Sequence, residues 1–405
     1  MTLLLDGDIR MFLSLFLVFG LGIIGGYIFE KIKLPKIVFY IILGILLGPS
    51  IFDVIDDTLI NISSYLRQIA LIIILTRSGL SLDVSTLKKI GRPAFLMCFL
   101  PACCEIIGIT IFAPLFLEID YFEALLVGSV LAAVSPAIVV PRMIKLMDEG
   151  YGNEHKVPDL ILAGASCDDI FVIVLFYSFK HMVSTSSFNA WMIAEIPLSI
   201  IGGVFLGIIS GLFLVLVFKY LKMNDIINVL FVLSLSFGMI AFESFLKPYF
   251  LVSSLLAIII MAMVLKKYKE EDAIKIKLSY NSLWSGYEIL LFVLVGIATD
   301  INYAISKEGA IIFGLIIIAL IFRSIGVLIS ILATNYNFKE KLFIVISYLP
   351  KATVQASIGA IALSEGLTCG TIVLTAAVIS ILFTAPLGAI LMDNSYKKLL
   401  INKEE

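Results

Sequence analysis

The sequence has few charged residues and almost no histidine. Only 15% of its 405 residues are Asp, Glu, Lys or Arg, and two are His; soluble domains carry about 25% charged residues. Apolar residues make up 60% and the mean hydropathy is +1.09. A soluble fold would expose too much of this apolar surface. The net charge of −2 leaves no basic surface for nucleic acid. We therefore expect an integral membrane protein whose main partner is the lipid bilayer.

Cysteine is also scarce and irregularly placed. An odd number of cysteines within or beside apolar runs argues against a disulfide framework. Their spacing to the two histidines does not suit a zinc-type site. There is no GxxxxGK[ST] segment for ATP, and we expect no cofactor. The cysteines are expected to be small buried apolar residues: Cys98, Cys103, Cys104, Cys167 and Cys369.

Long apolar runs dominate what is present. A membrane-spanning helix needs about 20 mostly apolar residues. Asp6 and Asp8 precede the first run, which we expect to be a retained span rather than a cleaved signal. The sequence therefore predicts an all-α membrane protein of about 13 transmembrane helices forming one transporter unit over 1–405. The candidate spans are 10–29, 35–48, 64–81, 94–117, 122–147, 157–182, 190–218, 225–242, 249–265, 284–300, 309–333, 340–363 and 370–392.

Basic residues are distributed unevenly between the predicted loops. With the N-terminus outside, the inner loops and the C-terminal tail hold 21 of the 29 Lys and Arg residues. These loops include the lysine-rich stretch 266–283. The positive-inside rule favours this orientation, so we expect a plasma-membrane protein with a cytoplasmic C-terminus. Only four basic residues remain on the outer side: Arg10, Lys180, Lys247 and Lys307.

Thirteen spans suggest an internal repeat. With 190–224 as a linker helix, six spans lie in 1–189 and six in 225–405, which gives inverted repeats. The fifth span of each half contains proline among small polar residues, in Ser135-Pro136-Ala137-Ile138 and in Pro350-Lys351-Ala352-Thr353. Proline removes a backbone donor. Interrupted helices at matching positions indicate a transport site.

Five ionisable residues lie deep in apolar runs, where charge is costly and usually functional. Three are acidic (Glu105, Asp168 and Asp169) and two are basic (Arg323 and Lys351). One negative charge is left over, and a cation or a proton could take that place in turn. Adjacent aspartates diverge by about 100° around a helix and cannot face one partner. Since unpaired buried charge is costly, we expect Lys351 to pair with one aspartate and Glu105 with Arg323.

Four segments resemble the monovalent cation:proton antiporter superfamily, and most closely its two-aspartate sodium/proton exchangers of the NHA type. They follow one another in the same order as in that family and cover nearly the whole chain. The Ser-Pro segment and the aspartate pair are the specific ones. The segments are Leu75-Thr76-Arg77-Ser78-Gly79-Leu80, Val134-Ser135-Pro136-Ala137-Ile138-Val139-Val140-Pro141, Cys167-Asp168-Asp169-Ile170 and Leu349-Pro350-Lys351-Ala352-Thr353-Val354-Gln355-Ala356.

The resemblance implies a six-helix core domain and a separate dimerisation domain, hence a homodimer. It also implies that the two interrupted helices cross at the midplane beside the aspartates. Asp169 resembles the carboxylate that binds Na⁺ or a proton, and Asp168 resembles its partner, in contact with a lysine or backbone. Ser135 and the unwound stretch after it (Pro136, Ala137 and Ile138) resemble auxiliary ligands.

One position departs from that pattern. Many two-aspartate exchangers have a lysine where this chain has Arg323, and here the lysine is Lys351, on the next helix. Arginine holds its proton far more firmly than lysine. Any stoichiometry that needs proton release at position 323 is therefore in doubt.

The function expected is exchange of Na⁺ or Li⁺ for H⁺ by alternating access, serving pH homeostasis, in a transporter that is not an enzyme. A K⁺/H⁺ antiporter of the same fold and a sodium-coupled organic anion symporter stay open as alternatives. An intramembrane aspartyl protease is disfavoured, because its two aspartates must face each other from separate helices. A channel would need a filter such as TVGYG, which the sequence lacks.

Overall fold

The computed structural model describes residues 7–82, 90–185, 190–221, 224–246 and 252–402. Within these ranges the secondary structure consists of helices and one isolated β-bridge between Tyr151 and Asn402. The chain divides into two compact units. The larger unit comprises residues 1–67, 83–183 and 289–405, and the smaller one 68–82 and 184–288.

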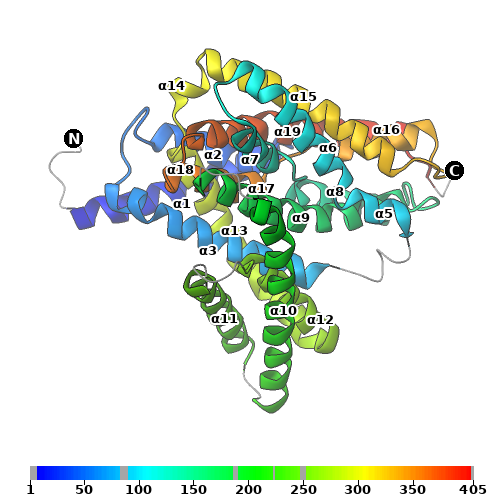
Figure 1. Cartoon of the computed structure of the whole chain (residues 1–405), viewed down its shortest axis with the longest axis horizontal. Coiled ribbons are helices and arrows are strands. Elements are labelled where there is room, and N and C mark those ends of the chain that lie inside the picture. Colours follow the sequence, from blue (N-terminus) through cyan, green and yellow to red (C-terminus); the bar gives the residue numbers. More distant parts are fainter. Residues whose placement is uncertain (1–6, 83–89, 186–189, 222–223, 247–251, 403–405) are drawn as a thin grey trace. The chain divides into compact units, whose positions relative to one another are not determined.

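The larger unit contains the helices that bear the predicted site (Figure 1). Helices α3 (Asp57–Ser81) and α13 (Glu270–Ile297) belong partly to each unit. The others in the larger unit are α1 (Gly7–Lys31), α2 (Lys36–Leu47), α5 (Arg92–Met97), α6 (Leu100–Phe116), α7 (Tyr121–Leu131), α8 (Pro136–Asp148), α9 (Val157–Thr185), α14 (Ile301–Ala304), α15 (Lys307–Ser330), α16 (Phe338–Ser347), α17 (Thr353–Gly359), α18 (Ile361–Ser364) and α19 (Gly370–Leu399). The smaller unit holds α10 (Ala190–Tyr220), α11 (Asp225–Leu246) and α12 (Ser254–Tyr268).

The all-helical membrane fold expected from the sequence is confirmed. Each of the thirteen expected spans overlaps one, two or three consecutive helices. Ten helical segments of the described ranges are long and apolar enough to cross a membrane. Three finer expectations stay predictions: the number of membrane crossings, the inverted repeats and the linker role of 190–224. The division into two compact units does not test the repeats, because a repeat is defined by symmetry and not by compactness.

One loop prediction is wrong. The lysine-rich stretch 266–283 was expected to be a loop, yet α12 continues to Tyr268 and α13 begins at Glu270. Both ends favour helix: Lys266 and Lys267 occupy the last turn of α12, and three acidic residues occupy the first turn of α13. These charges complement the dipoles of the two helices.

Both predicted interruptions are present. The first separates α7 from α8 at Ala132–Ser135, and the second separates α16 from α17 at Tyr348–Ala352. The two breaks touch, because the Ser135 backbone N donates to the Pro350 backbone O at 2.8 Å. The unwound residues precede Pro136 rather than follow Ser135, which corrects the expectation for Pro136, Ala137 and Ile138. Proline suits the first position of a helix, so α8 starts there.

Small residues let α6 and α15 approach closely, and the two helices run alongside each other (Figure 1). A Cβ added at Gly326 would lie 2.7 Å from the Cα of Pro101, and one at Gly108 would lie 2.6 Å from the Phe322 ring. Such glycine contacts are typical of helix packing in membranes. Glu105 lies one turn from Gly108, and Arg323 one turn from Gly326, so this approach brings the two charges together.

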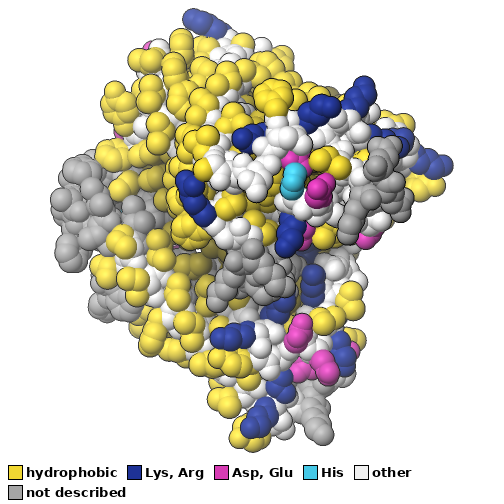
Figure 2. All heavy atoms as spheres, turned by 90° about the vertical axis from the view of Figure 1, so that its right-hand side faces the viewer, with side chains coloured by type: hydrophobic (Ala, Val, Ile, Leu, Met, Phe, Trp, Pro, Cys, Tyr) yellow, Lys and Arg dark blue, Asp and Glu magenta, His cyan; other side chains and the backbone are white. Residues whose placement is uncertain are grey.

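The molecular surface fits a lipid environment. In the view of Figure 2, broad hydrophobic areas are exposed between scattered basic and acidic side chains. Large apolar side chains are exposed on α1, α10 and α11, among them Phe12, Phe16, Phe205 and Phe245. Exposed apolar area of this extent needs a cover, and a bilayer supplies it.

Candidate ion-binding site

All five predicted charges lie inside the larger unit, and ion pairs join four of them: Glu105, Asp168, Arg323 and Lys351. Glu105 comes from α6, Asp168 and Asp169 from α9, Arg323 from α15, and Lys351 from the break after α16. Asp169 is 4% exposed and the other four side chains are 0% exposed. Charges buried this completely are tolerated only when they are paired and hydrogen-bonded.

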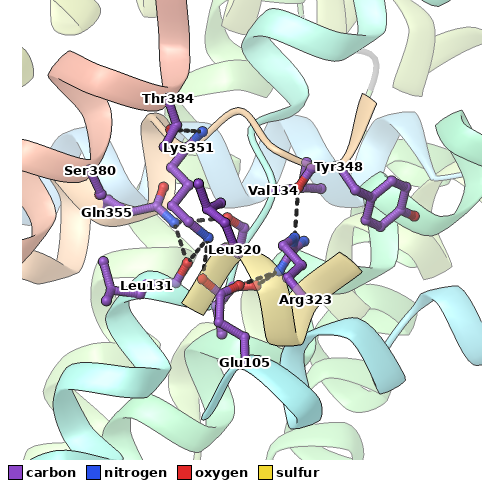
Figure 3. A network of polar contacts seen from close by, with 12 residues as sticks. Glu105, Leu131, Val134, Leu320, Arg323, Tyr348, Lys351, Gln355, Ser380 and Thr384 are labelled. Carbon is purple, nitrogen blue, oxygen red and sulfur yellow. Dashed lines mark hydrogen bonds and ion pairs between the residues drawn. The ribbon is translucent and has the colours of Figure 1, made fainter. Parts of the chain in front are cut away.

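Arg323 joins two of the acids to both helix breaks (Figure 3). Its Nη1 lies 2.8 Å from Glu105 Oε2 and its Nη2 lies 2.8 Å from Asp168 Oδ2. The guanidinium also donates to two backbone carbonyls, Tyr348 O at 2.7 Å and Ala132 O. A planar fork with several donors suits such a junction, and a lysine could not replace it. The predicted pairing of Glu105 with Arg323 is confirmed.

Lys351 contacts the other oxygen of the same glutamate. Its Nζ lies 2.6 Å from Glu105 Oε1 and donates to the carbonyl of Leu131. Its backbone N donates to Thr384 Oγ1 on α19 at 2.9 Å. An aspartate was the expected partner, and the structure gives this ion pair to Glu105 instead. The reason lies in packing: the close approach of α6 and α15 places Arg323 between Glu105 and Asp168, so Glu105 faces both bases.

Side chains also satisfy the backbone of both breaks. The backbone N of Val134 donates to Asp168 Oδ2 at 2.9 Å. Gln355 Nε2 donates to Ala133 O at 2.8 Å, and Gln355 Oε1 accepts from Ala352 N at 2.8 Å. Non-helical backbone at membrane depth needs such partners. Gln355 was missing from the predicted site, although a buried amide in an apolar segment was the available signal.

Hydroxyl oxygens at the two breaks remain without a hydrogen-bond partner within the described part of the chain. They are Ser135 Oγ, just before α8, and Thr353 Oγ1, at the start of α17. Both side chains are fully buried. The second carboxylate oxygen of Asp168, Oδ1, is in the same situation. Unsatisfied buried oxygens are rare and call for an explanation such as an ion or water, and hard oxygen ligands suit Na⁺ or Li⁺.

A contact between His155 and Glu340 fixes the ends of two site-bearing helices. His155 Nδ1, just before α9, lies 2.8 and 3.0 Å from the two carboxylate oxygens of Glu340 in α16. Glu340 is fully buried and completes a capping box with Asn337. Burial, helped by the charges of Glu340 and Asp159, raises the pKa of the neighbouring Tyr336 to about 12. The contact ties the helix of the aspartates to the second interrupted helix.

Comparisons with known proteins agree with this architecture. The family of transmembrane sodium/hydrogen exchangers matches residues 15–393. Human sodium/hydrogen exchanger 9B1 is 30% identical, over 96% of this chain and 78% of that protein. Human sodium/hydrogen exchanger 9B2 is 31% identical, over 94% and 73%. The sodium proton antiporter MjNhaP1 from Methanocaldococcus jannaschii has a TM-score of 0.83 at 20% identity, over 97% of this chain and 99% of that one, and so shares its fold.

Proposed function

Because the chain belongs to the sodium/hydrogen exchanger family, we propose that it is a secondary antiporter that exchanges Na⁺, or Li⁺, for protons across a membrane. The observation that carries the proposal is the charge of the buried cluster. Three carboxylates and two bases leave one negative charge, which a bound cation or a proton neutralises in turn.

We assign the cargo to Asp169, which resembles the ion-binding carboxylate of the two-aspartate exchangers, and a structural role to the other two acids. Glu105 lies between both bases, and Asp168 is held by Arg323 and by the backbone of Val134. These contacts suit a structural role. Asp169 is the third buried acid, and it projects from α9 about 100° away from Asp168.

The oxygens without partners at the breaks complete the proposed cation site. Ser135 Oγ and Thr353 Oγ1 would join the Asp169 carboxylate in replacing the water around Na⁺, which prefers oxygen ligands. A proton on Asp169 removes the charge that offsets the cation, so the two cargoes compete. The loaded site then opens to the opposite side by alternating access. We extend the proposal to a homodimer in the plasma membrane, with the N-terminus outside.

Purified protein in liposomes with an imposed pH gradient tests this function. A pH-sensitive dye inside the vesicles would report proton movement after addition of Na⁺, Li⁺, K⁺ or choline chloride. Na⁺ or Li⁺ is expected to collapse the gradient, while choline leaves it intact. A response to K⁺ alone would replace the sodium proposal with potassium/proton exchange. Protein that stays folded and responds to none of the cations would contradict antiport.

A further inference from the structure

Residues 97–99, at the junction of α5 and α6, lie along one face of α9. A Cβ added at Gly164 would lie 2.9 Å from the Cβ of Met97. The rings of Phe99 and Phe171 lie 6.0 Å apart, centroid to centroid. Helix positions three and four apart share a face, so Cys167, between Gly164 and Phe171, faces Cys98.

Cys98 and Cys167 are the two thiols at this packing contact. The Cys98 thiol donates to the carbonyl of Ala94 at 3.1 Å, and Cys167 faces Cys98 from α9. Both residues are half-buried rather than sealed in the core. Cys98 lies where α5 gives way to α6, and Cys167 immediately precedes Asp168. A covalent link between them would therefore join this junction to the part of α9 that bears the aspartates.

The hydroxyl of Tyr348 is a third polar group in this region, and it could donate a hydrogen bond to an oxidised sulfur. The hydroxyl of Tyr348 is fully buried and has no hydrogen-bond partner in the described ranges. The Arg323 guanidinium lies 5.4 Å from the centre of its ring. The Oη atom would lie 1.9 Å from a Cβ added at Gly164, on the face of α9 that carries Cys167. An oxygen atom added to either sulfur would give this hydroxyl an acceptor.

We propose that Cys98 and Cys167 form a dithiol site that a peroxide closes to a disulfide, and that closure inhibits exchange. The inhibition rests on the proposed antiport function, whereas the closure does not. Hydrogen peroxide is small and uncharged, so it reaches half-buried thiols that a charged reagent cannot. The product carries no charge, which suits a site with low dielectric.

The chemistry proceeds in two steps. One sulfur attacks peroxide, an S–O bond forms as the O–O bond breaks, and the thiol proton leaves with the departing oxygen as water. The resulting sulfenic acid accepts a hydrogen bond from Tyr348. The second sulfur then displaces the sulfenic oxygen, and that oxygen leaves as water with the second thiol proton. Two thiols are oxidised by two electrons in total, and peroxide is reduced to two waters.

The disulfide would act on transport through its position. Cys167 neighbours Asp168, whose carboxylate holds both Arg323 and the first helix break. Drawing the two sulfurs to bonding distance shifts this turn of α9 toward the α5–α6 junction. The geometry of the aspartates relative to the breaks changes with it, so we expect the oxidised protein to lose most of its exchange activity.

Peptide mass spectrometry of the full-length protein tests the closure. After treatment with hydrogen peroxide and alkylation of the remaining thiols, we expect a linked peptide that joins Cys98 to Cys167. Cys98→Ser and Cys167→Ser should not form the link, and Cys103→Ala, the matched control in the neighbouring turn, should form it. Alkylation of both Cys98 and Cys167 in peroxide-treated protein, or a link to Cys103 or Cys104 instead, would overturn the proposal. Tyr348→Phe should slow the closure, and an unchanged rate would exclude the role of its hydroxyl.

Flux in liposomes tests the inhibition. Peroxide should abolish most Na⁺-driven proton movement in the wild type and in Cys103→Ala, and dithiothreitol should restore it. Cys98→Ser and Cys167→Ser should keep their activity under peroxide. A complete disulfide with unchanged flux would overturn the inhibition. Untreated protein without any flux would instead count against antiport, and the mass measurement would still decide whether the dithiol closes.

Discussion

Arg323 is the residue on which the buried charges depend. It contacts Glu105 on α6, Asp168 on α9 and a carbonyl at each helix break. We predict that Arg323→Ala destabilises the protein by about 3–5 kcal/mol, because two buried carboxylates lose their counter-charge. Arg142→Ala is the matched control, since Arg142 pairs with Asp393 at the partly exposed surface and surface pairs contribute about 0–1 kcal/mol. Chemical denaturation in detergent measures both, and equal effects would contradict the central role of Arg323.

Substitution of Thr353 tests whether its hydroxyl binds the cation or only stabilises the fold. Thr353→Val keeps the shape of the side chain and removes an oxygen that has no hydrogen-bond partner among the residues described. We expect unchanged or slightly raised stability, because no hydrogen bond is lost, together with a roughly tenfold weaker apparent affinity for Na⁺, about 1.4 kcal/mol. Thr384→Val, which removes the acceptor of the Lys351 backbone N, should instead lower stability by about 1–3 kcal/mol. Unchanged Na⁺ affinity in Thr353→Val, measured by flux against Na⁺ concentration, would remove this oxygen from the site.

The single residues of the site were predictable, whereas their partners were not. Glu105, Asp168, Asp169, Arg323 and Lys351 stand out because a charge inside an apolar run is rare. Their pairing depends on which helices touch, and the sequence does not state that α6 and α15 approach on small residues. For this reason Glu105–Arg323 was predicted correctly, while Lys351 was assigned to an aspartate.

At the scale of helices, proline marked the interruptions but not their extent. Pro136 and Pro350 indicated both breaks, and the side on which the first helix unwinds was misjudged because Pro136 starts α8. The length of α13 was missed for a different reason: a run of lysines and acids resembles a loop in composition, while its order places each charge at the helix end that it stabilises.

The contact of α6 with α15 gives a prediction at this scale. Gly326→Ala would place a Cβ 2.7 Å from the Pro101 backbone, which cannot move without displacing α6. We expect a loss of about 1–3 kcal/mol from overpacking and reduced exchange, because the Glu105–Arg323 pair spans the same contact. Gly314→Ala on the same helix meets nothing within 4 Å and should leave stability unchanged or raise it by about 0.4–1 kcal/mol. Thermal unfolding of the two variants side by side provides the comparison, and equal melting temperatures would contradict the packing argument.

For the whole molecule, the charge count predicts the electrical behaviour of transport. Arg323 keeps its proton, and Lys351 is held by Glu105, so the cluster has the same charge with one Na⁺ as with one proton. We expect one-for-one, electroneutral exchange. Flux should not change when a potassium gradient with valinomycin sets the membrane potential of the liposomes. A rate that follows the potential would show that a further proton moves, with Lys351 as its source.

The central claim is that a cation and a proton compete for Asp169. At acidic pH, the Na⁺ concentration for half-maximal flux in the wild type should rise about tenfold for each unit that the pH falls, because only the unprotonated fraction binds. Asn has nearly the size of Asp and still forms hydrogen bonds, so Asp169→Asn should fold normally.

The most direct test is Na⁺-driven proton flux from purified Asp169→Asn protein in liposomes, with thermal stability as the check on folding. Our account predicts a folded protein with no exchange at any pH, since the side chain can neither hold a proton nor offset a cation. Normal flux from this variant would contradict it.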